Sequence, residues 1–122
     1  MFTLDSGLRV GILTCYDGWF PEPARALSLL GAECIVWING RGGNVEDFIV
    51  QSTMFQSHVA MVATNQAYGG GTMIGGCRAA SDPIPDKVMP AGGWSPSFYP
   101  QILERCEDGE EGYICCTYTS QG

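Results

Sequence analysis

Cys15 is the residue whose type and position best fit covalent chemistry. It ends an apolar run, Leu8 to Cys15, and directly precedes a turn that leads into a predicted helix. Open α/β sheets present reactive groups at the carboxyl ends of their strands. Such a turn can point backbone N–H groups at a developing oxyanion, and the start of the following helix favours a thiolate. Cys15 is therefore a candidate nucleophile, and the plain alternative is a buried structural cysteine.

The residues around Cys15 form a long and specific pattern, which reads GLRVGILTCYDGWFPEPARALSLLGA from Gly7 to Ala32. This stretch resembles the nucleophile region of the nitrilase superfamily, the carbon-nitrogen hydrolases, in which C-Y/W-D-x-x-F-P-E is followed by A-R-A-L and G-A-E. A looser resemblance continues to about Cys77. Within it, residues 70–74 resemble the family's G-x-S-x-I element, with Thr72 in place of the serine.

The resemblance implies a mechanism in which a Glu, a Lys and a Cys cooperate. The thiolate attacks an amide or nitrile carbon, the lysine and a backbone N–H hold the oxyanion, and the glutamate carries protons. By match to the motif, Cys15 is the nucleophile and the Tyr16 backbone N–H is the oxyanion donor. The resemblance further implies a thioester intermediate, no cofactor, a small amide, carbamoyl compound or nitrile as substrate, and a homo-oligomer.

The other two members of that triad have no match in this sequence. In the family the Glu and the Lys precede the cysteine, whereas fourteen residues precede Cys15 and the one lysine is Lys87. Because triad residues act as a unit, we expect residues 1–122 to be inactive alone. The chain is then the C-terminal portion of a nitrilase-type domain, a fragment or one piece of a split enzyme. The alternative is a non-catalytic nitrilase-like domain with an assembly or regulatory role.

Five further residues are candidates for support or substrate binding. Asp17 is expected to fix the turn by bonding backbone N–H groups, and Glu22 to order the helix start rather than to move protons. Asn39 and Arg41 follow a strand at the same expected sheet edge as Cys15, and Asn65 follows another. A guanidinium there can clamp a substrate carboxylate, and the alternative is a solvated turn.

A strand, helix, strand order positions the nucleophile. Leu8–Cys15 and Cys34–Ile38 are short apolar runs that predict buried strands. Between them, Pro21 to Leu30 is a strong helix-forming run that Gly31 closes. This order predicts a βαβ unit with a right-handed crossover.

A second helix and a third parallel strand are predicted next. Asn44 is expected to cap a helix that ends near His58. Its buried face is predicted from the spacing of apolar residues, namely Val45, Phe48, Ile49 and Phe55. Val59–Thr64 then predicts a strand, and Thr72–Ile74 a short extended segment.

The last part of the chain carries weaker patterns. Prolines between Ser81 and Tyr99 exclude long regular elements, so residues 80–111 are predicted to be mostly loop. The acidic run Glu104–Glu111 is predicted to be a helix end or turn. Gly112–Thr119 has strand character and predicts an edge strand.

Length and composition predict a single domain, residues 1–122, and the order of its elements makes it α/β. The resemblance implies that this domain is part of a four-layer αββα sandwich. The chain has 122 residues, of which 45% are hydrophobic and 16% charged. A net charge of −7 with scattered basic residues disfavours nucleic acid and anionic membranes as partners. Without a visible signal peptide or membrane span, we expect a cytoplasmic protein with reduced cysteines. A single histidine and no C-x-x-C pair predict no metal site.

Overall fold

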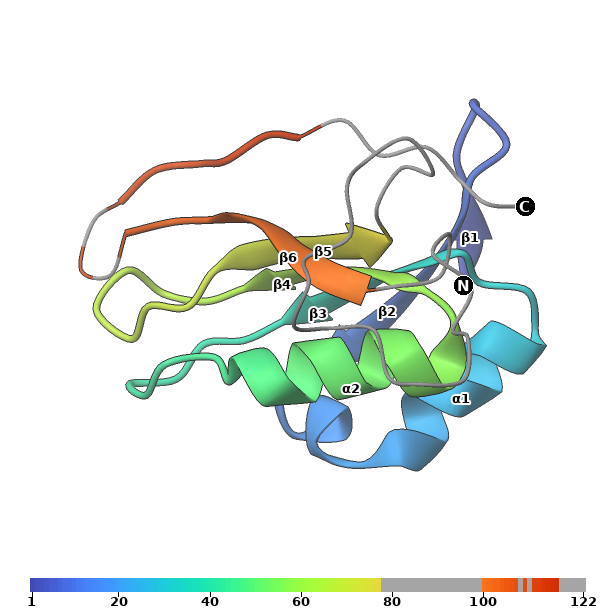
Figure 1. Cartoon of the computed structure of the whole chain (residues 1–122), viewed down its shortest axis with the longest axis horizontal. Helices are drawn as coiled ribbons and strands as arrows, with labels where there is room; N and C mark the ends of the chain where they lie inside the picture. The colour runs from blue at the N-terminus through green and yellow to red at the C-terminus, as the bar shows by residue number, and fades with distance from the viewer. Residues whose placement is uncertain (78–99, 108, 110, 117–122) are drawn as a thin grey trace, which may run out of the picture.

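A mixed β-sheet forms the centre of the fold (Figure 1). The computed structural model describes residues 1–77, 100–107, 109 and 111–116. The strands lie in the order of the sequence: β1 (Phe2–Thr3), β2 (Arg9–Thr14), β3 (Cys34–Ile38), β4 (Ala60–Thr64), β5 (Met73–Cys77) and β6 (Pro100–Arg105). The central strands β2, β3 and β4 are parallel, and β1, β5 and β6 pair antiparallel.

The connections between the parallel strands are helical, and both α-helices lie on one face of the sheet (Figure 1). A short 3-10 helix, η1 (Cys15–Trp19), leads from β2 into α1 (Pro21–Leu29), and α2 (Asp47–Ser57) connects β3 to β4. Pro21 begins α1, where its missing N–H costs nothing, and Gly31 follows its end at φ +104°. The predicted βαβ unit is confirmed. Neither helix of the described residues is long and apolar enough to cross a membrane.

The core lies between the sheet and the two helices. Leu13, Trp37, Ala63 and Met73 form one row across four strands, because each pairs in register with the next. All four are buried, and Trp37 has no exposed surface. The helices close this row with buried apolar residues, Ala24 from α1 and Val50 and Met54 from α2. Burying a large apolar side chain contributes about 1.5–3 kcal/mol, so this row anchors the sheet.

The opposite face of the sheet is also apolar. Ile12, Val36, Val62 and Ile74 form a second in-register row there. Ile12 is 46% exposed and Ile38 45% exposed. The described residues thus provide one helix layer and one sheet layer, as expected for part of a nitrilase-type sandwich, and the free face has the composition of a surface that packs against a second sheet.

The start and the buried face of α2 were predicted wrongly. The helix begins at Asp47 with Glu46 as N-cap, not Asn44. Val45 is buried but precedes the helix, and Phe48 is 70% exposed. The fully buried residues of the helix are Val50, Met54 and Ser57, which lie on one face at i, i+4 and i+7. Of the predicted face, Ile49 does pack against the core and is partly buried. His58 ends α2 at φ +56°, as the sequence indicates.

The carboxyl-terminal predictions also need correction. Residues 100–105, predicted to be loop and, from Glu104, a helix end or turn, form β6. Pro100 is the first residue of that strand, a position where a proline is tolerated. The strand predicted at Gly112–Thr119 is wrong over 112–116, which have no regular structure, and 117–119 lie outside the described residues. The loop predicted between Ser81 and Tyr99 also lies outside them.

Candidate active site

Cys15 is the first residue of η1 and directly follows β2, in a strained backbone conformation. Its φ is +48°, in the left-handed region, which a residue with a Cβ seldom adopts. Holding one such residue costs roughly 1–3 kcal/mol, and strained positions of this kind cluster at active sites.

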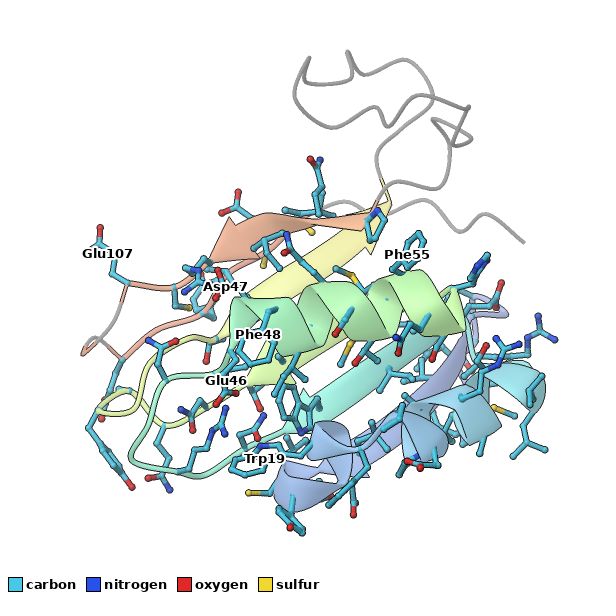
Figure 2. All side chains as sticks on the ribbon, turned by 60° about the horizontal axis from the view of Figure 1, so that its bottom comes forward. Trp19, Glu46, Asp47, Phe48, Phe55 and Glu107 are labelled. Atoms are coloured by element: carbon cyan, nitrogen blue, oxygen red, sulfur yellow. The ribbon has the colours of Figure 1, made fainter. Side chains whose placement is uncertain are left out.

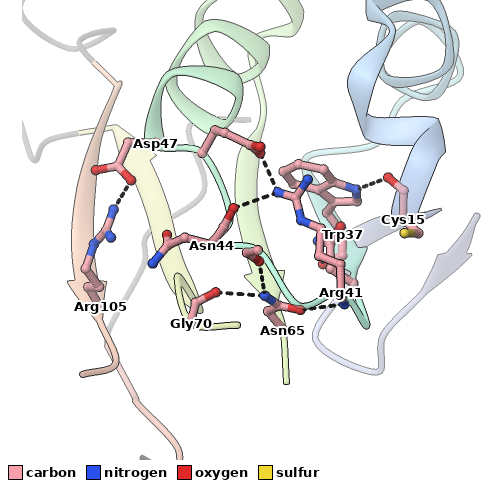
Figure 3. Close-up of polar contacts among 11 residues, drawn as sticks. Cys15, Trp37, Arg41, Asn44, Asp47, Asn65, Gly70 and Arg105 are labelled. Carbon is pink, nitrogen blue, oxygen red and sulfur yellow. Dashed lines mark hydrogen bonds and ion pairs between the residues drawn. The ribbon is translucent and has the colours of Figure 1, made fainter. Parts of the chain in front are cut away.

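A buried tryptophan on the neighbouring strand holds this turn. The Trp37 indole Nε1–H donates a hydrogen bond of 2.8 Å to the Cys15 carbonyl oxygen (Figure 3). The ring of Trp37 also packs on the backbone of Gly18, where an added Cβ would lie 2.2 Å from Cε2. Sequence reasoning missed both residues. The available signal was an indole in a buried apolar strand, because a buried Trp N–H usually finds an acceptor.

The two predicted support residues both follow Cys15, Asp17 within η1 and Glu22 in the first turn of α1. Asp17 accepts a hydrogen bond from the Thr14 backbone N–H through Oδ2, at 3.3 Å. This contact joins the end of β2 to η1. Glu22 lies exposed in the first turn of α1, where a carboxylate favours the helix start.

Aromatic rings surround the turn on its outer side. The Tyr16 ring is 62% exposed and lies 5.0 Å from the Phe20 ring, edge to face. Trp19 lies at the end of η1 (Figure 2). The centre of its ring is 5.4 Å from that of Tyr16. The Tyr16 side chain therefore points to the surface, so any part that this residue plays at Cys15 falls to its backbone N–H.

Arg41 is part of the structure around Trp37 and is not a solvated turn residue. Its guanidinium forms an ion pair with Glu46 and donates to the Asn44 carbonyl at 3.1 Å (Figure 3). The same group lies 5.7 Å from the centre of the Trp37 ring and 5.6 Å from that of Trp19. A cation over two aromatic faces is stabilised by the ring quadrupoles. Arg41 thus connects the loop between β3 and α2 to the turn that contains Cys15, residues 15–19, which we call the nucleophile turn.

Asn65 holds two glycine-containing loops together. Its Nδ2 donates to the carbonyls of Gly43 and Gly70, each at 2.9 Å, and its Oδ1 accepts from the Arg41 backbone N–H at 3.0 Å. The sequence predicted Arg41 and Asn65 at one sheet edge, and the structure brings them into contact. The side chains of Arg41 and Asn65 thus form hydrogen bonds with other residues of the same chain.

Asn39 lies at the same edge and is 7% exposed. Its Nδ2 donates weakly to the Trp37 carbonyl at 3.4 Å, and its backbone N–H donates to Thr64 at 3.0 Å. Among the described residues its Oδ1 has no hydrogen-bond partner. Asn39 thus lies two residues after Trp37, with one buried acceptor that no described residue bonds.

A small cavity of about 220 Å³ lies at the ends of β4 and β5. Its lining includes Asn65, Thr72 and Cys106 together with the carboxylates of Glu107 and Glu111. Cys15 is not part of this lining. The cavity and the turn at Cys15–Trp19 are thus separate features. Asn65 lines the cavity and bonds to the backbone of Arg41, whose guanidinium lies near the Trp19 ring.

Five cysteines whose side chains the structure describes differ in their surroundings. Cys15 and Cys106 are half-buried, Cys34 is buried, and Cys115 and Cys116 are exposed. Burial raises the pKa of the Cys34 thiol to about 11. Cys34 is therefore almost entirely a thiol at neutral pH, and it is unreactive as a nucleophile.

Comparison with known proteins agrees with this geometry. The sequence model of the carbon-nitrogen hydrolases matches residues 1–90, which contain the nucleophile turn and the first five strands. The chain belongs to the carbon-nitrogen hydrolase family. The resemblance seen around Cys15 is thereby confirmed at the level of the family.

Individual proteins are similar to this chain over stretches of 38 to 91 residues. An (R)-stereoselective amidase from Pseudomonas sp is 34% identical over 91 residues, which are 70% of this chain and 33% of the amidase. N-carbamoylputrescine amidase from Solanum tuberosum is 41% identical over 39 residues, 32% of this chain and 13% of that protein. Deaminated glutathione amidase from Escherichia coli O157:H7 is 50% identical over 38 residues, which are 28% of this chain and 14% of that protein. The chain thus spans a third or less of these relatives.

Proposed function

We propose that the protein to which this chain belongs hydrolyses the C–N bond of a small amide, carbamoyl compound or nitrile through a thioester on Cys15. The observation that carries this proposal is the strained φ of +48° at Cys15, at the carboxyl end of a parallel strand. Strained positions of this kind cluster at active sites, and this one lies within the residues that the carbon-nitrogen hydrolase model matches. The amidase names of the relatives support the same substrate class.

With an amide, the proposed reaction has two steps. The Cys15 sulfur forms a bond to the carbonyl carbon, the C–N bond breaks, and the amine leaves with a proton. Water then attacks the thioester, which releases the acid and restores the thiol. The developing oxyanion accepts a hydrogen bond from the Tyr16 backbone N–H, and Asp17 keeps the turn in place through Thr14.

Proton transfer needs groups that the motif does not provide within residues 1–122. Asp17 is engaged with the backbone, and Glu22 lies exposed at the start of α1. We infer that the Glu and Lys of the family mechanism come from another part of the polypeptide or from a second chain. The relatives are consistent with this inference, because the stretches that match this chain make up a third or less of their length.

Arg41 and Asn65, predicted to bind substrate, are assigned a different part in this proposal. Arg41 pairs with Glu46, and Asn65 uses its amide on Gly43 and Gly70. We propose that they shape the rim of the site by fixing its loops. Asn39 remains a candidate for contact with substrate through its unused Oδ1.

The second candidate is a non-catalytic domain that takes part in assembly. The in-register row of Ile12, Val36, Val62 and Ile74 favours it, because an apolar sheet face is an association surface. The two candidates differ in one respect: only the enzyme needs the thiol of Cys15.

The test is release of ammonia or amine from a panel of small amides by the full-length protein that carries this chain. Cys15→Ala should abolish turnover, whereas Cys115→Ala, at an exposed cysteine, should leave it unchanged. Equal turnover by the wild-type protein and Cys15→Ala would refute the proposed function. Absence of turnover in all three proteins would favour the assembly role.

A further inference from the structure

We propose that Trp37 is a positioning residue for the oxyanion donor: its indole N–H, through the Cys15 carbonyl, sets the direction of the Tyr16 backbone N–H and strengthens it as a donor. This inference rests on the proposed function. It adds a residue on β3, outside the nucleophile motif, to the machinery of the thioester-forming step.

The first argument is the geometry of one peptide group. The Cys15 carbonyl and the Tyr16 N–H belong to the same planar unit, and in a trans peptide they point in opposite directions. The Trp37 Nε1–H holds the carbonyl oxygen at 2.8 Å. Figure 3 shows the carbonyl turned toward the indole, while the sulfur points away from it. Fixing the carbonyl therefore fixes the N–H on the side away from Trp37.

The second argument is electronic. A hydrogen bond to a peptide oxygen draws electrons from the nitrogen of the same group, so the N–H becomes a better donor. Cooperative strengthening of this kind is about 10–30% per bond. The effect is largest when negative charge develops opposite the N–H, as it does in a tetrahedral intermediate.

The third argument is that the indole cannot turn away. Trp37 has no exposed surface, and its strand neighbours in register are Leu13 and Ala63. The backbone of Gly18 fits against the ring edge that carries Nε1, since an added Cβ would lie 2.3 Å from that atom. Arg41 lies over the ring face at 5.7 Å. The donor is thus pre-organised before any substrate binds.

The test compares two reactions of the Cys15 thiol in the 122-residue chain. Acylation by p-nitrophenyl acetate passes through a tetrahedral oxyanion: the S–C bond forms, the C–O bond to the aryl group breaks, and p-nitrophenolate leaves with the electron pair. Alkylation by iodoacetamide forms an S–C bond and expels iodide without an oxyanion. Neither leaving group needs a proton from the protein, so the missing Glu and Lys do not limit the comparison.

The variants remove the indole N–H by two routes. Trp37→Phe removes it with part of the ring, and site-specific replacement of Trp37 by benzothienylalanine exchanges the N–H for sulfur at nearly constant shape. Trp19→Phe is the matched control, because Trp19 lies in the same turn and its ring contacts are with Tyr16 and Arg41. Thermal unfolding followed by circular dichroism shows which variants fold. If Trp37→Phe does not fold, the benzothienylalanine variant alone tests the inference.

Rates at each cysteine are read by peptide mass spectrometry, with exposed Cys115 as the internal reference. We expect the ratio of acylation to alkylation at Cys15 to exceed that at Cys115, and to fall about tenfold in the isostere but not in Trp19→Phe. An unchanged ratio in the isostere would overturn the inference and leave the proposed function intact. A wild-type ratio no higher at Cys15 than at Cys115 would overturn both, since Tyr16 would then be no oxyanion donor.

Discussion

Gly18 and Trp37 fit together so closely that the position of the indole depends on the absence of a side chain at residue 18. An added Cβ would lie 2.2 Å from Cε2 and 2.3 Å from Nε1 of Trp37. Real Cβ atoms do not approach a fully buried ring so closely, and the ring has no surface toward which it can yield. The nucleophile turn and strand β3 are therefore one packed unit.

Gly18→Ala should accordingly be destabilising. The methyl group must displace the indole or η1, and overpacking of this kind costs about 1–3 kcal/mol. Urea unfolding should show this loss. Gly43→Ala is the control, because a Cβ at Gly43 meets nothing within 4 Å. Equal stability of the two variants would show that the turn is not packed against Trp37 as described.

Cys34 should make the protein sensitive to alkali. Burial raises its pKa to about 11 from 9.0, so between these values the folded state keeps a proton that the unfolded state has lost. Stability from this group is complete below pH 9 and is lost as pH rises toward 11, by no more than about 1.4 kcal/mol per pH unit. Urea unfolding at pH 8, 9 and 10 measures it.

The matched variants for this experiment are Cys34→Ala and Cys115→Ala, both kept reduced. The free energy of unfolding of Cys34→Ala should fall less steeply as pH rises. At pH 8 this variant should be less stable than the wild-type chain, because it loses buried atoms. Cys115→Ala, at an exposed cysteine, should follow the wild-type slope. If Cys34→Ala and the wild-type chain lose stability in parallel above pH 9, the buried thiol does not titrate as described.

The apolar sheet face should make the 122-residue chain self-associate. Ile12 lies in the middle of β2 on this face and is 46% exposed. Ile12→Lys should shift sedimentation velocity profiles toward the monomer, because it places a charge where two faces meet. Leu29→Lys is the control, since Leu29 is 73% exposed on α1, on the helix side. A wild-type chain that sediments as a compact monomer would contradict this prediction.

Local patterns predicted the elements that are continuous in the sequence. β3 was predicted with its observed bounds and β2 within a residue at each end, because a short apolar run between turn residues has few other readings. The acceptance of Pro100 in β6 depends on pairing with β5, which lies more than twenty residues away in the sequence. Such pairing is not visible in local composition.

In the candidate site, too, the sequence revealed the residues of a contiguous motif but not the contacts that depend on folding. Cys15 and Asp17 stand out because the motif is contiguous. Arg41 was placed at the right edge of the sheet, but its contacts with Glu46 and with the rings of Trp19 and Trp37 were not predicted. Only the folded chain brings these groups together.

The central claim is that Cys15 is the nucleophile of a carbon-nitrogen hydrolase. The most direct measurement is peptide mass spectrometry of the full-length protein, acid-quenched during turnover of a slow amide substrate. We predict an acyl group in thioester linkage on the peptide that contains Cys15, and its absence in Cys15→Ala. An acyl group on another residue, or turnover that persists in Cys15→Ala, would contradict the account.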